Sequence, residues 1–361
     1  MSTMKRTLGK SGIEVSPMGM GCWAIGGPFM MFGKPDGWGD IDDGESIRAI
    51  HRAVDLGINF FDTAEAYPTT PATPENSGDT ERIIGTWFEK RGKRDDIILA
   101  TKVAGAGNRN IDEGAPVSAE KIRRACERSL QRLKTDYIDL YQIHWPNRGS
   151  YHFRQTWTWA PQTHDGEKAR QDFLEALETM DALVKEGKIR HFGLSNETVW
   201  GTMTYLRMAE EKGLPRLASM QNEYSLLHRI FDLDFAELAL REDVGLLAYT
   251  STASGSLSGK YRGGDIPAGS RMTVQPNLNS RYTERSIPAI EAYLDIAGKH
   301  GLDPAQMAIA FALSRPFTTA VIIGATKMQQ LKTDIAAVDL DLSDAVLEDI
   351  QETWKRFPLP L

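Results

Sequence analysis

The stretch NFFDTAEAY, residues 59–67, begins like a buried β-strand and ends in polar chemistry. Ile58, Phe60 and Phe61 form the apolar run, Asp62 closes it, and Tyr67 follows five residues later. Such a run is typical of a strand covered on both faces. The rest of the chain must explain why a core strand ends in a carboxylate and is followed by a phenol.

Similar short apolar runs recur along the chain and predict further strands. Each is bounded by a longer segment of different periodicity, and PMGMG at 17–21 is a weaker eighth example. The clearer runs are INFFD at 58–62, IILATK at 97–102, YIDLYQIH at 137–144, RHFGLS at 190–195, ASMQNEY at 218–224, VGLLAY at 244–249 and AVIIGA at 320–325.

The segments between these runs have the 3.6-residue period of helices. Ser118 is a suitable N-cap for a helix whose apolar side chains fall at helical spacing from Ile122 to Leu133. A second pattern runs from Phe173 to Val184. The other helices are predicted near 45–56, 79–91, 198–212, 232–242, 287–300, 327–337 and, after the last βα unit, 343–356.

Strands that alternate with helices indicate parallel strands joined by crossover connections. No repeat of 20–50 residues and no Pro/Gly linker divides the chain. We therefore expect one (β/α)₈ (TIM) barrel domain over residues 1–361, and an open doubly wound sheet is the alternative. The segment KRTLGKSGIEV at 5–15 predicts an N-terminal hairpin within about 1–16, and about 338–361 holds the last helix and tail.

Three connections exceed the length needed to join neighbouring elements. They cover 24–43, 68–78 and 146–168, and all follow strands, so they should lie on one face of a barrel. Their aromatic side chains either pack the loops down or form the wall of a substrate pocket. The candidate wall residues are Trp23, Trp145, Trp157 and Trp159.

Composition narrows the function further. The chain has 361 residues with a formal net charge of −7, which argues against a nucleic-acid surface. Its two cysteines, Cys22 and Cys126, do not form a disulfide framework and fit a reducing compartment. The absence of a signal-peptide core or a membrane-length apolar run leads us to expect a soluble, cytoplasmic protein. The oligomeric state is not readable.

Polar residues end three neighbouring predicted strands. Asp62, Lys102 and His144 each close an otherwise apolar run, and Tyr67 lies just beyond the first. In a (β/α)₈ barrel the carboxyl ends of the strands form the active face. Each residue alone has an ordinary structural explanation, as a helix cap, a solvated cation or a core histidine. Three adjacent strand ends make a shared site the better interpretation.

These four side chains suit proton donation to a carbonyl oxygen. A nearby ammonium should lower the pKa of a phenol, and a carboxylate should hold that ammonium in place. A histidine can orient the substrate oxygen by a hydrogen bond. No nucleophile accompanies them, and no side chain supplies a hydride, so a nicotinamide cofactor is implied.

The chain resembles the aldo-keto reductase family from end to end, and most closely its bacterial Tas-type branch. The resemblance is carried by FFDTAEAYP, ATK, DYIDLYQIHWP, GKIRHFGLSNET, QNEYSLLHR, LSGKY and GLDPAQMAIAF. It implies a (β/α)₈ barrel, NADPH-linked carbonyl reduction and a catalytic tetrad. In that tetrad Tyr67 is the acid, Lys102 and Asp62 tune it, and His144 orients the carbonyl.

The same resemblance implies cofactor contacts in several segments. Ser195, Asn196 and Gln221 match residues that bind the carboxamide, and Tyr249 matches the ring that stacks on nicotinamide. The loop from Thr250 to Tyr261 matches a pyrophosphate strap, although it lacks the usual Ser-Pro-Leu-Gly. The remaining implied contacts are Cys22, Trp23, Asp62, Thr250, Ser251, Thr252, Ser254, Gly259, Lys260, Ser270, Arg271, Gly324, Thr326, Lys327, Gln330 and Asp334. Lys260, Arg271 and Lys327 are cations suited to a 2′-phosphate, which favours NADP(H) over NAD(H).

Other chemistries lack their motifs. MGMGCWAIGG is not a G-x-G-x-x-G fingerprint, and GSLSGKY is one residue short of a P-loop. The seven histidines show no metal-ligand spacing, so no metal is expected, and G-x-S-x-G is absent. Two functional alternatives stay open. One is a nicotinamide-binding regulatory subunit, as in the channel β-subunit relatives of the family, and the other is oxidation of an alcohol or sugar.

Overall fold

The strands close into a barrel. A computed structural model of the chain describes residues 5–23, 45–69, 72–325 and 328–361. Within these residues, eight parallel strands pair in chain order and the last pairs with the first, which confirms the predicted barrel over the open sheet. They are β3 (Met18–Gly21), β4 (Phe60–Asp62), β5 (Ile98–Val103), β6 (Ile138–Ile143), β7 (Ile189–Ser195), β8 (Ser219–Glu223), β9 (Gly245–Tyr249) and β10 (Thr318–Ile323).

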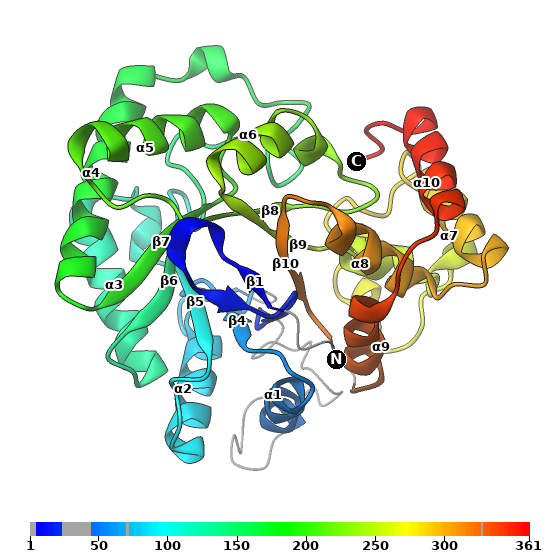
Figure 1. Cartoon of the computed structure of the whole chain (residues 1–361), viewed down its shortest axis with the longest axis horizontal. Helices are drawn as coiled ribbons and strands as arrows, with labels where there is room; N and C mark the ends of the chain where they lie inside the picture. Colours follow the sequence, from blue (N-terminus) through cyan, green and yellow to red (C-terminus); the bar gives the residue numbers. More distant parts are fainter. Residues whose placement is uncertain (1–4, 24–44, 70–71, 326–327) are drawn as a thin grey trace.

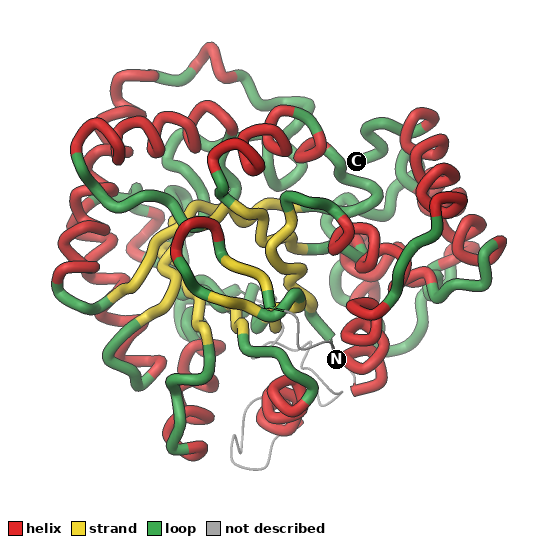
Figure 2. Tube along the Cα trace, viewed as in Figure 1, coloured by secondary structure: helices red, strands yellow, loops and turns green. Residues whose placement is uncertain are grey.

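Helices surround the barrel, as Figures 1 and 2 show. The Ser118 Oγ accepts a 3.2 Å hydrogen bond from the Lys121 N–H, so this residue is the predicted cap. The α-helices are α1 (Glu45–Asp55), α2 (Asp79–Arg91), α3 (Ala119–Leu133), α4 (Gly166–Lys185), α5 (Val199–Lys212), α6 (Asp234–Glu242), α7 (Ile287–Lys299), α8 (Pro304–Ser314), α9 (Met328–Ala336) and α10 (Asp344–Arg356). Short 3₁₀ turns are η1 (Gly9–Ser11), η2 (Asp112–Gly114), η3 (Pro161–Thr163), η4 (Ile230–Asp232), η5 (Ala253–Ser258), η6 (Arg262–Gly264), η7 (Arg271–Thr273), η8 (Pro276–Leu278) and η9 (Ala337–Asp339).

Helix α8 was not predicted as a helix. Every residue from Met307 to Leu313 is buried, so the segment has no polar face to produce a helical period. Asp303 caps it by accepting from the Gln306 N–H, and Pro304 occupies the first turn. The crossover from β9 to β10 therefore contains two helices, and α8 is the one that packs against β10.

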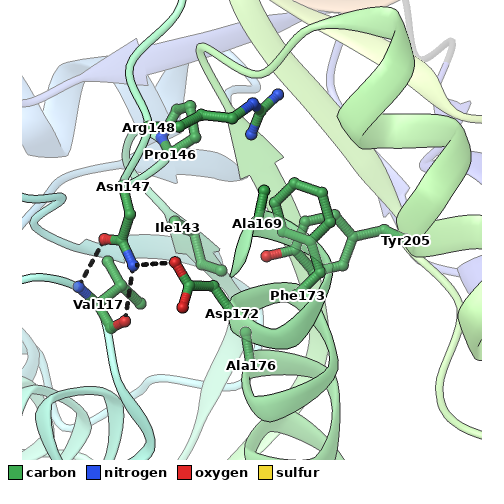
Figure 3. A pocket seen from close by; sticks show the side chains of 10 residues that line it. All are labelled: Val117, Ile143, Pro146, Asn147, Arg148, Ala169, Asp172, Phe173, Ala176 and Tyr205. Carbon is green, nitrogen blue, oxygen red and sulfur yellow. Dashed lines mark hydrogen bonds between the residues drawn. The ribbon is translucent and has the colours of Figure 1, made fainter. Parts of the chain in front are cut away.

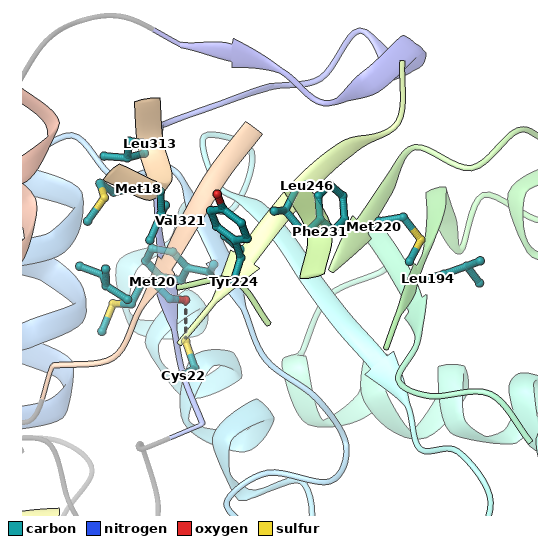
Figure 4. Packing of buried hydrophobic residues seen from close by; sticks show 14 of the residues in the cluster. Met18, Met20, Cys22, Leu194, Met220, Tyr224, Phe231, Leu246, Leu313 and Val321 are labelled. Carbon is teal, nitrogen blue, oxygen red and sulfur yellow. Dashed lines mark hydrogen bonds between the residues drawn. The ribbon is translucent and has the colours of Figure 1, made fainter. Parts of the chain in front are cut away.

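The core has two layers because side chains alternate along each strand. Met18, Met20 and Val321 point outward and pack beneath the helices (Figure 4). Phe60, Ala100, Leu140, Leu247 and Ala320 point into the barrel and form a separate cluster. Both layers are almost fully buried.

The N-terminal hairpin closes one end of the barrel, as predicted. Strands β1 (Arg6–Thr7) and β2 (Glu14–Val15) pair antiparallel, and the hairpin lies across the barrel in Figure 1. Leu8 and Val15 pack against the inner cluster. Gly9 has φ +50° and approaches the Ala218 carbonyl so closely that a Cβ would lie 2.5 Å from its oxygen. A glycine is required at this contact.

Strand β3 is glycine-rich for a packing reason. A Cβ on Gly19 would lie 2.5 Å from Cδ1 of Phe60, and one on Gly21 would lie 2.8 Å from Cγ2 of Ile322. These inward positions are therefore filled by side chains of the neighbouring strands. The glycines weaken the apolar signal of 17–21, which explains why this strand was the least evident in the sequence.

Candidate active site

Asp62 and Lys102 form a buried ion pair at the carboxyl ends of β4 and β5. The Lys102 Nζ donates to Asp62 Oδ2 at 2.7 Å and to the Thr63 carbonyl at 2.7 Å. Lys102 is fully buried and Asp62 nearly so. Because the two strands are neighbours in the barrel, their last inward side chains meet. This contact answers why the β4 strand can end in a carboxylate.

Two glutamines complete the surroundings of Asp62. Its Oδ1 accepts from Gln221 Nε2 at 2.8 Å and from Gln142 Nε2 at 3.4 Å. Gln142 lies on β6 and Gln221 on β8, so the carboxylate is bound from three directions. A buried carboxylate that accepts several hydrogen bonds is held in a single position. Gln142 was not predicted as a site residue.

Tyr67 and His144 face each other above this pair. Tyr67 Oη lies 3.5 Å from His144 Nε2, and the two rings meet edge to face at 5.5 Å between centroids. The Lys102 ammonium lies 5.0 Å from the Tyr67 ring centroid. The structure thus brings together all four residues of the predicted tetrad.

The pKa shifts favour the neutral forms of the tyrosine and the histidine. Desolvation and then the Lys102 charge hold the pKa of His144 well below its usual value. Desolvation and then the Asp62 charge raise the pKa of Tyr67 well above 10. The expected lowering of the Tyr67 pKa is therefore wrong for this structure, because burial of the phenol and then the Asp62 carboxylate raise it instead. Tyr67 remains protonated at neutral pH, which is the form a proton donor requires.

A cavity of about 750 Å³ opens above the tetrad. Asp62, Tyr67 and His144 line it directly, whereas Lys102 lies behind Asp62. Its size is that of a site for a large small-molecule ligand. Most of the predicted cofactor and substrate residues also line it: Trp23, Trp145, Ser195, Asn196, Gln221, Tyr249, Thr250, Ser251, Thr252, Ser254, Lys260, Ser270, Arg271, Gly324, Gln330 and Asp334.

The residues matched to carboxamide binding form one hydrogen-bonded group. Ser195 Oγ donates to the Gln221 carbonyl at 2.9 Å and accepts from Asn196 Nδ2 at 3.0 Å. Asn196 has φ +55°, a conformation that asparagine tolerates, and Tyr249 Oη donates to its Oδ1. The group offers both donors and acceptors beside the Tyr249 ring, which suits a planar amide.

Arg271 provides the sharpest test of whether an anionic cofactor fits. Its guanidinium lies 4.2 Å from the Trp23 ring centroid, and its Nε donates to Gln275 Oε1. It forms no ion pair with a carboxylate in the described part of the chain. Desolvation and then Arg281 lower its pKa to about 9. Ser254 and Ser270 also present buried hydroxyls without a described partner. A phosphate would satisfy all three groups.

Some predicted site residues do not face the cavity. The Cys22 side chain points into the outer core near Met20 (Figure 4), and Gly259 is not part of the lining. Trp157 is 58% exposed and donates from Nε1 to the Leu361 carbonyl. Trp159 packs against Tyr151 and His164. Neither tryptophan is part of the cavity lining.

Other predictions fall outside the described residues: Thr326, Lys327 and the connection 24–43.

The sequence did not indicate several residues that line the cavity. Phe153, Arg154 and Arg281 come from connections after β6 and β9, and Glu223 ends β8 and pairs with both arginines. Each arginine lies more than 50 positions from Glu223 in the sequence. Glu223 follows the strand-end pattern of Asp62 and could have been found by it.

Two classes of site are not seen. Among the described residues, no three histidine, cysteine, aspartate or glutamate side chains are grouped as metal ligands. No helix in the same ranges is long and apolar enough to span a membrane.

The chain is a (β/α)₈ barrel with a buried Asp–Lys–Tyr–His group at the carboxyl ends of its strands. Comparison with known proteins identifies its family. The model of the Aldo/keto reductase family matches residues 17–355, so the chain belongs to this family. Family members are generally nicotinamide-dependent oxidoreductases that act on small carbonyl compounds.

Three relatives illustrate the range of the similarity. Protein tas of Escherichia coli is 41% identical over 97% of both chains. The uncharacterized oxidoreductase YrpG of Bacillus subtilis is 32% identical over 96% of this chain and 94% of its own. A probable voltage-gated potassium channel subunit beta of Arabidopsis thaliana is 28% identical over 98% of this chain and 97% of its own.

Proposed function

We propose that the protein reduces an aldehyde or ketone to an alcohol with NADPH. The observation that carries the proposal is the 3.5 Å approach of Tyr67 Oη to His144 Nε2 at the floor of a large cavity. A carbonyl oxygen that faces both atoms from the cavity can accept one hydrogen bond from Tyr67 Oη and one from His144 when the proton of its neutral ring is on Nε2. A nicotinamide cofactor, when bound, supplies the hydride.

The roles of the tetrad follow from its protonation. Neutral His144 orients the carbonyl oxygen, and Tyr67 Oη gives up its proton as negative charge develops there. Lys102 stabilises the resulting phenolate, and Asp62 fixes Lys102 through the 2.7 Å ion pair. Reversal of the same steps oxidises an alcohol.

The cofactor position is supported by the two ends of the cavity. Ser195, Asn196 and Gln221 would hold the carboxamide, and Tyr249 would stack on the ring. Thr250–Lys260 and Arg271 would hold the phosphates. The absence of a described carboxylate partner for Arg271 supports NADPH over NADH, because the 2′-phosphate adds a second anionic group.

The test is a turnover assay with a panel of small aldehydes and ketones and with each cofactor. We expect loss of the NADPH absorbance with part of the panel and a lower kcat/KM with NADH. Equal kcat/KM with both cofactors would contradict the NADPH assignment. Tight NADPH binding without turnover on any compound would instead favour a regulatory or redox-sensing subunit, a role consistent with the similarity to the channel β-subunit.

A further inference from the structure

The connection from β6 to α4 brings two strained residues to the cavity. Phe153 and Arg154 line it, and both have left-handed backbone conformations, with φ +55° and +64°. This conformation is unfavourable for a residue that has a Cβ. Strain of this kind persists only where the surroundings enforce it, and it concentrates at functional sites.

The start of this connection is firmly anchored, as Figure 3 shows. The Asn147 side chain exchanges hydrogen bonds of 2.7 and 2.9 Å with the Val117 backbone and donates to Asp172 at 3.1 Å. The Arg148 guanidinium lies 5.1 and 5.0 Å from the ring centroids of Phe173 and Trp200, and it pairs with Glu197. The adjoining cavity is only about 20 Å³, the size of a single water molecule, and offers no second ligand site. The anchors fix where Phe153 and Arg154 project.

Arg154 adds positive charge to the ion pair of Arg281 and Glu223, whose two charges already cancel. Arg281 binds Glu223 through two parallel hydrogen bonds, from Nε to Oε1 at 2.7 Å and from Nη2 to Oε2 at 2.9 Å. Its Nη1 donates to the Leu278 carbonyl. Arg154 Nη1 shares Oε2 at 2.9 Å. The cluster of two guanidiniums and one carboxylate therefore has a net charge of +1.

The unused edge of Arg154 is suited to a second anion. A guanidinium has five N–H donors, and in the described chain only Nη1 of Arg154 has a partner. The Nε and Nη2 donors lie on one edge of the guanidinium plane, the arrangement that binds a carboxylate or phosphate through two hydrogen bonds. The side chain is 15% exposed, so part of it is reachable by a ligand in the cavity.

Aromatic rings lead from the proton donor to this arginine. The His144 and Trp145 rings contact each other in a tilted arrangement with centroids 4.9 Å apart, and Trp145 meets Phe153 edge to face at 6.0 Å. Tyr67, His144, Trp145 and Phe153 all line the same cavity. A substrate bound along them would have its carbonyl at Tyr67, an apolar or aromatic body against the rings, and its far end beside Arg154.

We propose that the substrate is a carbonyl compound with an anionic group, a carboxylate or a phosphate, separated from the carbonyl by an apolar body, and that Arg154 binds this group. The inference rests on the proposed carbonyl reduction. It adds a substrate class and makes Arg154 a specificity-determining residue.

The test compares three aldehydes with the same ring: benzaldehyde, 4-carboxybenzaldehyde and 4-formylphenyl phosphate. We expect kcat/KM to be higher for at least one charged aldehyde than for benzaldehyde. Arg154→Gln should lower kcat/KM for that aldehyde by roughly 10–100-fold, the range of a lost charge-assisted hydrogen bond, mainly through KM. Benzaldehyde turnover and the Kd for NADPH should remain close to wild type. Arg154→Lys should restore part of the loss.

Arg285→Gln is the matched control. Arg285 stacks on Trp157 of the same connection but does not line the cavity. It should leave the preference for the charged aldehyde intact. An equal loss with both arginine variants would mean that the loop itself had moved, and this would overturn the assignment.

Two other results would also overturn it. One is a wild-type preference for benzaldehyde over both charged aldehydes. The other is a tenfold or greater rise in the NADPH Kd of Arg154→Gln with equal loss for all aldehydes, which would assign Arg154 to the cofactor phosphates.

Calorimetric binding of 4-carboxybenzyl alcohol to the NADP⁺ complex tests the anion site separately from the proposed carbonyl reduction. Binding that depends on Arg154 without turnover of any aldehyde would refute carbonyl reduction and retain the anion site. Absence of Arg154-dependent binding would refute the anion site.

Discussion

At the N-terminal end of the barrel interior, Leu8, Val15 and Phe60 pack into a layer of aliphatic and aromatic side chains. At the C-terminal end, Asp62 occupies an inward position of β4, the strand that holds Phe60, and Lys102 occupies one of β5, and the two are buried and paired. The strand backbones are continuous from one end to the other. The side chains are buried at both ends. At the apolar end, removal of apolar surface from water stabilises the fold, whereas at the polar end the attraction within the ion pair only offsets the cost of desolvating its charges.

Removal of Lys102 should produce the largest change in stability. Lys102→Met leaves the buried Asp62 carboxylate with only amide partners, and we expect a loss of about 3–5 kcal/mol in the free energy of unfolding. Urea denaturation measures it. The double variant Asp62→Asn/Lys102→Met should recover part of the loss, because it removes the charge that was left unpaired. A loss under about 1 kcal/mol in the single variant would show that the pair is solvated.

A substitution at the apolar end should lower stability without changing activity. Leu140→Ala creates a cavity in the inner cluster, and we expect a loss of about 2–5 kcal/mol in the free energy of unfolding. Activity per folded molecule should not change, because Leu140 does not line the site cavity. A fall in kcat at a temperature where the variant is fully folded would contradict the independence of the two ends.

Acid should weaken the fold through His152, a buried histidine at the polar end. Burial lowers the pKa of His152, at this end, to about 3, whereas the unfolded value is about 6.5. Below pH 6.5 the unfolded state therefore binds more protons than the folded state. As the pH is lowered, His152 then decreases the free energy of unfolding by about 1.4 kcal/mol for each pH unit. His152→Gln should reduce the slope of the unfolding free energy against pH, measured by urea denaturation between about pH 6 and 4. Leu140→Ala should lower the unfolding free energy at every pH and leave that slope unchanged. An unchanged slope in His152→Gln would contradict the buried neutral form.

The chemical step should be the least sensitive to pH. The pKa of Tyr67 is raised well above 10 and that of His144 is held well below its usual value, so neither group titrates near neutrality. The single-turnover rate of NADPH oxidation should be flat between about pH 6 and 9. A step near neutral pH in this rate would mean that one of the two groups changes protonation there.

The polar end was more predictable than the loops above it. Each strand contributes one residue at its carboxyl end, so Asp62, Lys102 and His144 could be placed from a strand register alone. Trp157 and Trp159 could not, because the path of a long connection depends on contacts such as the one from Trp157 to Leu361. Arg154 was missed for the same reason, since its partner Glu223 is 69 residues away.

Two further differences between the sequence predictions and the structure have physical causes. Helix α8 is buried on all sides and so lacks a polar face that would reveal its period. The direction of the Tyr67 pKa shift depends first on the burial of the phenol and then on its distance from the Asp62 carboxylate. Neither quantity is contained in the spacing of the residues.

The central claim is that Tyr67 donates the proton to the carbonyl oxygen. Tyr67→Phe removes one oxygen atom and keeps the ring beside His144, so the cavity and the NADPH Kd should be preserved. The measurement is the single-turnover rate of NADPH oxidation by a saturating aldehyde. The account predicts a fall of roughly 10²–10⁴-fold. A rate equal to wild type, with NADPH bound equally well, would contradict it.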